Sequence, residues 1–229
     1  RETVSEAASG DFGRGVDVTA GARAELERVE LTAHRDAAVF ADGSSTSLVL
    51  ADLVARDTQT RTSDGGGGTG LLAQHAAQVD VTRVVASRNH ETGMVATGIG
   101  TILTLVDSVV RDTQSRDDGQ LGHGLEAAGG AEVLAERVLL ERNREVGVLA
   151  SGADSSVTLR DAVIRDTGPP ESGDEHGAWI HAQLGGRVQG ERVRLLRNLD
   201  RGAYAMHAGT VITLADALGR DTRATSTGG

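Results

Sequence analysis

A repeated tripeptide constrains the fold of this chain more than any other sequence feature. Arg-Asp-Thr occurs four times, at successive spacings of 55, 54 and 55 residues. Arg-Asp or Arg-Asn pairs lie between the copies, so the merged Asp and Asn positions are separated by 21 to 32 residues. A fixed period of this length is typical of stacked supersecondary units. The sequence therefore predicts coils of roughly 23 residues, with eight or nine extra residues in every second coil.

Each coil contains short segments in which apolar and polar residues alternate. Ile102–Leu105 and Val211–Leu214 show the alternation, and Gly93–Ala96 shows the small apolar segment that follows an Asn. Such short, β-branched runs of period two predict strands. A leucine-rich repeat is the alternative, but it needs a helical segment in the place where the alternating runs occur. Three strands and three turns per coil predict a triangular solenoid whose coils bury one another's inner faces.

The recurring Asp and Asn residues are expected to stack as one structural ladder along the solenoid. Both residue types tolerate the left-handed backbone region and bond to nearby backbone amides in turns. An amide placed between two carboxylates can donate to both and separates their charges. The expected ladder comprises Asp36, Asp57, Asn89, Asp112, Asn143, Asp166, Asn198 and Asp221.

The coil pattern resembles a known group of proteins. A V-x-L-x-x-N pattern, a following G-x-x-A segment and the Asn ladder are similar to the right-handed parallel β-helix repeats of the pectin-lyase-like superfamily. The resemblance implies an all-β, three-sided solenoid of about eight coils over residues 15–222, with inserted loops in alternate coils. Residues 1–14 would form an N-terminal segment that could cap it, and residues 223–229 a tail. The superfamily includes lyases, hydrolases, epimerases, adhesins and inert stalks, so the fold does not determine the function.

The inserted segments are the candidate functional region. They occupy residues 59–70, 114–124 and 168–177, and a stacked repeat should place them side by side along one edge. Loops on a rigid scaffold commonly carry function. His123 and His176 are 53 residues apart, each followed by Gly, and are expected to be stacked neighbours. The candidate ligand-binding residues are Trp179, Asp117, Asp118, Asp174 and Glu175.

Three uses of this edge remain open. The loops could be solvated and bind nothing, or their carboxylates could hold calcium, a cation that prefers oxygen ligands. A polysaccharide-processing site is the third, because glycosidases use two carboxylates at about 5 to 9.5 Å. Its catalytic candidates are Asp118, Asp174, Glu175, His123 and His176. Because the loops are nearly equivalent, we expect that none of these residues is catalytic. Calcium is the one cofactor that stays possible, and the sequence does not assign its ligands.

Composition excludes several classes of partner. The net charge of −10 argues against nucleic acid, and no apolar run approaches the ~18 residues of a membrane span. All 23 basic residues are Arg, which indicates a high-GC bacterial coding bias. The ladder still runs at Asp221, and the small polar tail is unsuited to capping. We therefore expect further coils of the same chain or end-to-end self-association.

These observations predict a non-catalytic structural or adhesive module of a secreted or cell-surface protein. It would present its loop-bearing edge to a polysaccharide or to a surface protein. The alternative is a polysaccharide lyase or glycoside hydrolase of the pectin-lyase-like type that acts on an acidic polysaccharide. The sequence leaves open whether the chain is an enzyme and favours the view that it is not.

Overall fold

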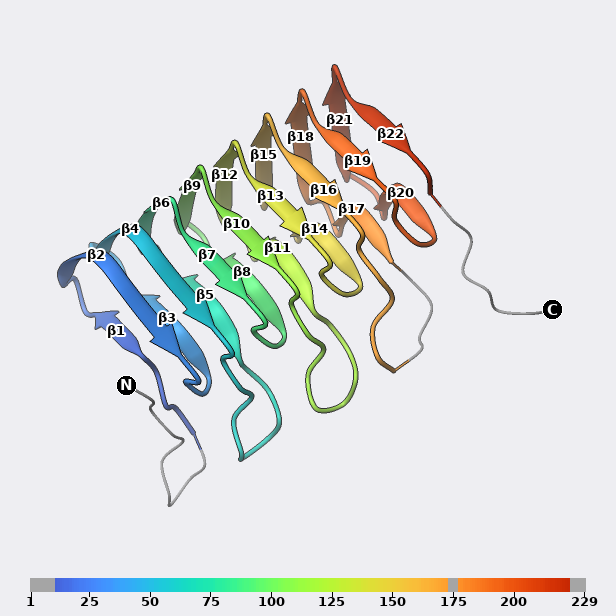
Figure 1. The fold of residues 1–229 in the computed structure, drawn as a ribbon. Coiled ribbons are helices and arrows are strands. Elements are labelled where there is room, and N and C mark those ends of the chain that lie inside the picture. The colour runs from blue at the N-terminus through green and yellow to red at the C-terminus, as the bar shows by residue number, and fades with distance from the viewer. Residues whose placement is uncertain (1–10, 173–176, 223–229) are drawn as a thin grey trace.

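The computed structural model describes residues 11–172 and 177–222 (Figure 1). Within these ranges the regular secondary structure consists of β-strands alone. All the strand pairs are parallel. The chain is therefore an all-β protein with long parallel sheets, which is compatible with the expected parallel β-helix.

The first sheet has eight strands, and each pairs with the strands of the same kind before and after it in the chain. In spatial order they are β1 (Val16–Thr19), β3 (Ala37–Asp42), β5 (Thr69–Gln74), β8 (Thr92–Thr97), β11 (His123–Ala128), β14 (Val146–Ser151), β17 (Ala178–Gln183) and β20 (Arg201–Met206).

The other strands belong to a second sheet, which bends into two rows because β2 and β4 are long enough to pair in both. The first row comprises the first halves of β2 (Arg23–Thr32) and β4 (Ser47–Arg56), then β6 (Gln78–Thr82), β9 (Ile102–Val106), β12 (Glu132–Glu136), β15 (Ser156–Arg160), β18 (Arg187–Glu191) and β21 (Val211–Ala215). The second row comprises the second halves of β2 and β4, then β7 (Val85–Ser87), β10 (Val109–Arg111), β13 (Leu139–Glu141), β16 (Val163–Arg165), β19 (Arg194–Leu196) and β22 (Leu218–Arg220).

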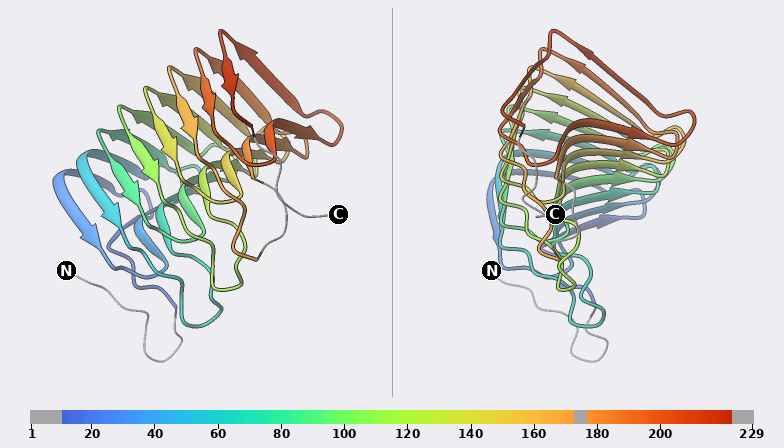
Figure 2. Two further views of the ribbon diagram at one scale, coloured as in Figure 1. Left: turned by 45° about the vertical axis from the view of Figure 1, so that its right-hand side comes forward. Right: turned by 90° about the vertical axis from the view of Figure 1, so that its right-hand side faces the viewer.

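The chain visits the three rows in turn, so each strand of the first sheet begins one coil. The described residues thus form eight coils, stacked along one axis with the inserted segments protruding on one side (Figure 2). From Thr69 to Thr92 the chain advances 23 residues, and from Thr92 to His123 it advances 31. The strands lie inside the predicted range 15–222. The predicted tail 223–229, and residues 1–10 of the predicted N-terminal segment, lie outside the described residues.

The alternating segments place their apolar residues inside the coils. In the first row, Leu48, Val79, Leu103 and Val133 occupy one inward-facing column and are each at most 1% exposed. Side chains of one column contact those of the next coil, at the strand spacing of about 4.8 Å. The core therefore consists of continuous columns of Leu, Val, Ile and Ala along the axis.

The register divides the expected single ladder into two adjacent columns. Arg56 pairs with Ser87, and Arg111 with both Ser87 and Glu141, so Asp57 lies beside Arg88 rather than beside Asn89. The exposed corner column alternates Asp and Arg, and the buried column one residue later alternates Thr and Asn. In the Arg-Asn coils, Arg occupies the corner position that Asp occupies in the Arg-Asp-Thr coils. The corner column is Ala33, Asp57, Arg88, Asp112, Arg142, Asp166, Arg197 and Asp221, and each of these residues has a positive φ.

Asp36 belongs to neither column, because Ala33 holds the corner and His34 the buried position of its coil. It corresponds instead to Glu91, Glu145 and Asp200, which also have positive φ and directly precede a strand of the first sheet. The prediction of one ladder is wrong because it aligns the Asp of one coil with the Asn of the next, which are chemically similar. That alignment is shifted by one residue from the observed register, and such a shift exchanges buried and exposed positions.

Bidentate ion pairs hold the corner column together. Nε and Nη2 of Arg88 donate to the two carboxylate oxygens of Asp57 at 2.7 and 2.9 Å. The same geometry joins Arg142 to Asp112 and, two coils later, Arg197 to Asp166. Fork-to-fork pairing suits the planar guanidinium. The negative charges are therefore neutralised by Arg in the next coil, and not separated by Asn.

The buried column supplies hydrogen bonds inside the turn. Asn143 is 1% exposed, and its Oδ1 accepts from the backbone N and Oγ1 of Thr113 at 3.2 and 2.7 Å. Its Nδ2 donates to the Val110 carbonyl oxygen at 3.3 Å. Asn89 bonds in the same way to Thr58 N and the Ala55 carbonyl. The Asn amide therefore satisfies backbone groups of the preceding coil that would otherwise be buried without partners.

Loss of the Asn143 amide should cost far more stability than loss of a charge of the corner column. Asn143→Ala leaves Thr113 and Val110 without their buried partner, so the free energy of unfolding should fall by about 1–3 kcal/mol. Arg88→Gln, at the equivalent corner two coils earlier, breaks a half-exposed ion pair with Asp57 and should cost less than about 1 kcal/mol. Urea denaturation followed by circular dichroism measures both. Equal losses in the two variants would contradict the division into buried and exposed columns.

Glycines of the first sheet permit close packing between coils. A Cβ on Gly93 would stand 2.2 Å from Cγ1 of Val110 and 2.7 Å from the Gly124 carbonyl oxygen. Gly93→Ala should therefore lower the free energy of unfolding by about 1–3 kcal/mol through overpacking. Gly168→Ala is the control, because a Cβ there meets nothing within 4 Å. A destabilisation by Gly168→Ala as large as that by Gly93→Ala would show that loss of glycine, and not crowding, is responsible.

Candidate binding surface

The inserted segments contact one another along one edge. The Thr60 hydroxyl donates to Oδ1 of Asp117 at 2.9 Å, which joins the first segment to the second. The backbone N of Ser172 donates to the Gly119 carbonyl oxygen at 2.8 Å, which joins the second to the third. Figure 1 shows the segments protruding side by side after β4, β10 and β16. We call this row of segments the loop-bearing edge.

The carboxylates expected to act on this edge are engaged within it. Asp118 accepts from Nη2 of Arg116 at 2.5 Å and from the backbone N of Gln120 at 2.9 Å. The Arg116 hydrogen bond holds the pKa of the Asp118 carboxyl below its usual value. Asp117 is committed to Thr60, as described above, and Asp64 pairs with Arg61. Asp174, Glu175 and His176 lie outside the described residues, so the expected pairing of Asp118 with Asp174 or Glu175 stays a prediction.

Trp179 is not available as a ligand contact. It is 2% exposed and lies in the hydrophobic core. It occupies the column in which neighbouring coils carry Gly147 and Gly202, and a Cβ on Gly202 would stand 2.8 Å from its ring. The alternating context suggests an outward side chain, but the first sheet is irregular at this position, where Val146 pairs with Ala178 and the next pair is Val148 with Ile180. The indole therefore fills the space inside the coils that the absence of side chains at Gly147 and Gly202 leaves open.

His123 lies buried beneath the loop-bearing edge, between two carboxylates. Its side chain is 5% exposed, with Nδ1 3.0 Å from Oε2 of Glu126 and Nε2 3.5 Å from Oε2 of Glu145. The second distance is that of an ion pair without hydrogen-bond geometry. Burial by itself lowers the pKa of His123, but the two carboxylates outweigh it and raise the pKa to about 10. The pairings of the first sheet continue the His123 column through Val146 to Ala178.

A row of carboxylates under the loops was missed in the sequence. Glu91 accepts from the backbone N of Gly67 at 2.5 Å, and Glu145 accepts from the backbone N of Leu121 at 2.9 Å. Burial raises the pKa of the Glu91 carboxyl. A glutamate thus occupies this position in every second coil, and its carboxylate accepts a hydrogen bond from the backbone of the inserted segment before it. Glu91 and Glu145 are 54 residues apart, which matches the 54- or 55-residue spacing of the Arg-Asp-Thr copies. This shared spacing is the sequence feature that could have identified them as one column.

The outward side of the first sheet forms a floor beside the loops. A hollow of about 280 Å³ lies there, next to the first inserted segment. Its walls include Asp36, Arg61 and Glu91. Its floor comes from side chains that point outward from β5, β8 and β11, namely Leu72, Gln74, Val95, Thr97, Glu126 and Ala128. We call this outward side, continued through β14, β17 and β20, the outer face.

The outer face carries aromatic side chains at its C-terminal end. His181 and Tyr204 pair in register, with ring centroids 5.1 Å apart and an angle of 41° between the planes. The Arg201 guanidinium lies 4.2 Å from the centre of the Tyr204 ring. The strand alternation that predicts an outward Trp179 in fact places His181 and Tyr204 outward. These rings, and not the indole, are the aromatic groups of this surface.

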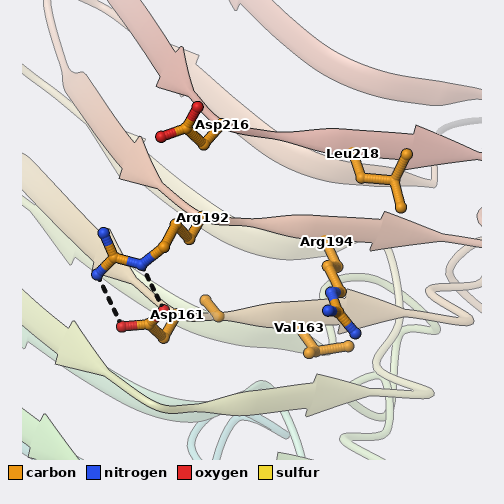
Figure 3. A pocket seen from close by; sticks show the side chains of 7 residues that line it. Asp161, Val163, Arg192, Arg194, Asp216 and Leu218 are labelled. Atoms are coloured by element: carbon orange, nitrogen blue, oxygen red, sulfur yellow. Dashed lines mark hydrogen bonds and ion pairs between the residues drawn. The ribbon is translucent and has the colours of Figure 1, made fainter.

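A second hollow, of about 510 Å³, lies away from the loops near the C-terminal coils (Figure 3). Val163, Arg194 and Leu218 line one side, and the ion pair of Arg192 with Asp161 lines the other. The Arg192–Asp161 ion pair recurs with the repeat, as Arg83 with Asp52 and Arg137 with Asp107, at the corner between the two rows of the second sheet. The hollow lacks the inserted segments and the polar floor of the outer face, so we give it no functional role.

The described residues contain neither a cluster of metal-binding side chains nor a membrane-spanning helix. Among residues 11–172 and 177–222, no group of three or more His, Asp or Glu side chains is arranged to hold a metal ion. The calcium site therefore stays a prediction that would need ligands beyond these ranges. No helix within the described part of the chain has the length and apolar character of a membrane span.

Comparison with known proteins yields no relative: no family model, no curated protein and no solved structure matches the chain. The resemblance to the pectin-lyase-like superfamily thus rests on the coil pattern alone.

The charge of His123 should make stability fall at alkaline pH. Because its pKa is higher in the folded chain than the usual value of 6.5, its stabilising contribution is complete below about pH 6.5 and is lost towards pH 10. The chain has no Lys and no Cys, so few other groups titrate in this interval. The free energy of unfolding relative to His123→Thr should fall by on the order of a few kcal/mol between pH 6 and pH 10.

Urea denaturation at intervals across that range measures the effect. Thr is the matched replacement, because Thr92 occupies the same column one coil earlier and is also buried. A constant difference between the two proteins would mean that His123 does not change protonation in this range.

Proposed function

We propose that the chain is a right-handed parallel β-helix of the pectin-lyase-like type, and that it is a non-catalytic binding module of a secreted or cell-surface protein. Its ligand would be an extended neutral polysaccharide that lies on the outer face along the loop-bearing edge. A structural or adhesive role follows from this, since a stiff solenoid that holds a polysaccharide anchors one surface to another.

The repetition of hydrogen-bonding side chains along the outer face carries the proposal. One outward column runs through Gln74, Thr97, Ala128, Ser151 and Gln183 at steps of about 4.8 Å per coil, so four of these five coils offer a hydrogen-bonding side chain. A sugar polymer offers hydroxyl groups at a regular spacing, and such a column can donate to or accept from them. Tyr204 and His181 add an aromatic end on which a sugar ring can stack.

The charge of the outer face supports a neutral ligand over an acidic one. Glu126 lies on the floor, and Glu91 lies in the wall of the hollow. The Arg residues of the loops that could attract a uronate, Arg61 and Arg116, are already paired with Asp64 and Asp118. An acidic polymer would therefore meet carboxylates at the hollow, while the two loop Arg residues named here are already neutralised.

The same pairings disfavour the lyase or hydrolase alternative. Either reaction needs two groups free to exchange protons or to attack the substrate. Asp118 is tied to an Arg of its own loop, and His123 is enclosed by Glu126 and Glu145. Asp174 and Glu175, the other carboxylates expected to take part in such a reaction, lie outside the described residues.

Binding to neutral polysaccharides tests the proposal. Affinity electrophoresis against neutral and acidic polymers should show retardation by a neutral polymer, and Tyr204→Ala should weaken it about two- to tenfold, the worth of one stacking contact. Ile99→Ala is the control, because Ile99 is 84% exposed but lies in a turn between rows. Equal binding by both variants would exclude the outer face, and binding of acidic polymers only would exclude the neutral ligand.

The enzymatic alternative is tested on the same panel, with and without calcium. Ultraviolet absorbance detects unsaturated lyase products, and reducing ends detect hydrolysis. We expect neither signal. Product formation that disappears in Asp118→Ala or Asp174→Ala would overturn the non-catalytic proposal and locate an active site on the loop-bearing edge.

A further inference from the structure

The coils associate in pairs through hydroxyl groups. In the turn between the first sheet and the second, Thr101 donates to the Thr97 carbonyl of its own coil at 2.9 Å and accepts from the backbone N of Ala76 in the coil before at 2.9 Å. Thr46, Ser155 and Thr210 do the same in the second, sixth and eighth coils. The described solenoid is thus four units of two coils.

A different interaction joins one unit to the next. At the corner between the two rows of the second sheet, Arg83 of the third coil forms a bidentate pair with Asp52 of the second at 2.6 and 2.9 Å. Two further junctions repeat this pair through Arg137 with Asp107 and Arg192 with Asp161. Every unit therefore presents Arg at its N-terminal side and Asp at its C-terminal side.

The two ends of the described solenoid continue this pattern without completing it. Arg28 holds the Arg position of the first coil, has positive φ like the rest of the column, and among the described residues forms an ion pair with the adjacent Glu27 alone. Asp216 holds the Asp position of the eighth coil and has no ion-pair partner among the described residues. Figure 3 shows Asp216 beyond Arg192, with no contact drawn to its carboxylate.

The first and last described coils also hold apolar residues that are only partly buried. The inward residues that are only partly buried all belong to the first and last coils: Val16, Ala24, Leu26, Val29, Ile212 and Leu214. The residues of the same columns in the interior coils, such as Val188 and Leu159, are fully buried. Each end of the described coils thus offers unpaired strands and a partly buried apolar surface, and the corner between the two rows carries Arg28 at one end and Asp216 at the other.

We propose that a second copy of this chain stacks its first coil on the eighth coil of the first copy, with Arg28 of one copy paired to Asp216 of the other. The contact repeats the junction already present three times inside the chain. Because it joins different surfaces of the two copies, it is heterologous and extends to open filaments.

The match covers one corner and not the other. At the second corner Asp221 would face Ala33, which occupies the position that Arg88, Arg142 and Arg197 hold elsewhere. One of the two ion pairs of an internal junction is therefore missing. The association between copies is expected to be weaker than the contact between coils, and reversible.

Disulfide cross-linking tests the geometry directly, because the chain contains no Cys. In stacked parallel strands, equivalent Cα atoms lie about 5 Å apart, within the range of a disulfide. Under mild oxidation, an Arg28→Cys, Asp216→Cys double variant should give a ladder of dimers, trimers and longer species. Either single variant should stay monomeric, since like ends do not meet.

Collision between exposed thiols is controlled by an Arg83→Cys, Asp216→Cys variant. The Arg83 side chain is 55% exposed, in the same column but inside the solenoid. A ladder from this control as strong as that from the end-to-end variant, or covalent dimers from the single variants, would overturn the proposal.

Charge exchange tests the ion pair without a covalent bond. Sedimentation velocity over a range of concentrations should show reversible association that 1 M salt weakens. Asp216→Arg should raise the dissociation constant at least about tenfold, and Arg28→Asp combined with Asp216→Arg should restore it. Asp80→Arg, on the exposed side of β6, is the control and should leave association unchanged. A chain that is monomeric throughout, or a double variant that fails to recover while its melting temperature is normal, would refute the proposed contact.

Discussion

In-register parallel pairing is the constraint on which the whole structure depends. Each backbone position must match the same position one coil away, because a strand that slips by one residue turns its buried side chains outward. The side chains of one column therefore meet along the entire solenoid. Leu48, Val79 and Leu103 satisfy this with apolar contacts, and Gly93 with Gly124 satisfies it by leaving space. Columns, rather than single residues, are the units of stability here.

Two kinds of polar column make the turns compatible with this stacking. Asn89, Asn143 and Asn198 are buried, and their side-chain oxygens accept from backbone groups of the coil before. One residue earlier, Asp and Arg alternate at an exposed corner and neutralise each other. Left-handed backbone at such corners is easier for Asp than for Arg, and the bidentate pair gives Arg a compensating contact. A chain rich in carboxylates can thus place them in one column with an Arg between each two.

The same stacking explains why many polar groups of the loop-bearing edge are already hydrogen-bonded within the protein. Segments that lie side by side bond to one another, as Thr60 does to Asp117 and Gly119 to Ser172. The acids beneath them, Glu91 and Glu145, accept from loop backbone and order the segments. The surface left for a ligand is the outer face, where side chains recur at the strand spacing. A repeating surface is suited to a repeating ligand, which is the basis of the polysaccharide proposal.

The sequence by itself determined the period, the strand segments and the extra residues of alternate coils, because alternation and turn residues are local signals. It did not show that in the first two coils β2 and β4 each run through both rows of the second sheet. It also determined that the inserted segments lie together, since stacking follows from the period. Only the tertiary structure decided the register within a turn: Asp57 meets Arg88, and Asn89 meets Thr58, because the corner residue differs between the two kinds of coil. It also decided that Trp179 lies inside while Tyr204 lies outside, and that Glu145 encloses His123. These outcomes depend on which residue of one coil faces which residue of the next, and a single coil carries no information about that.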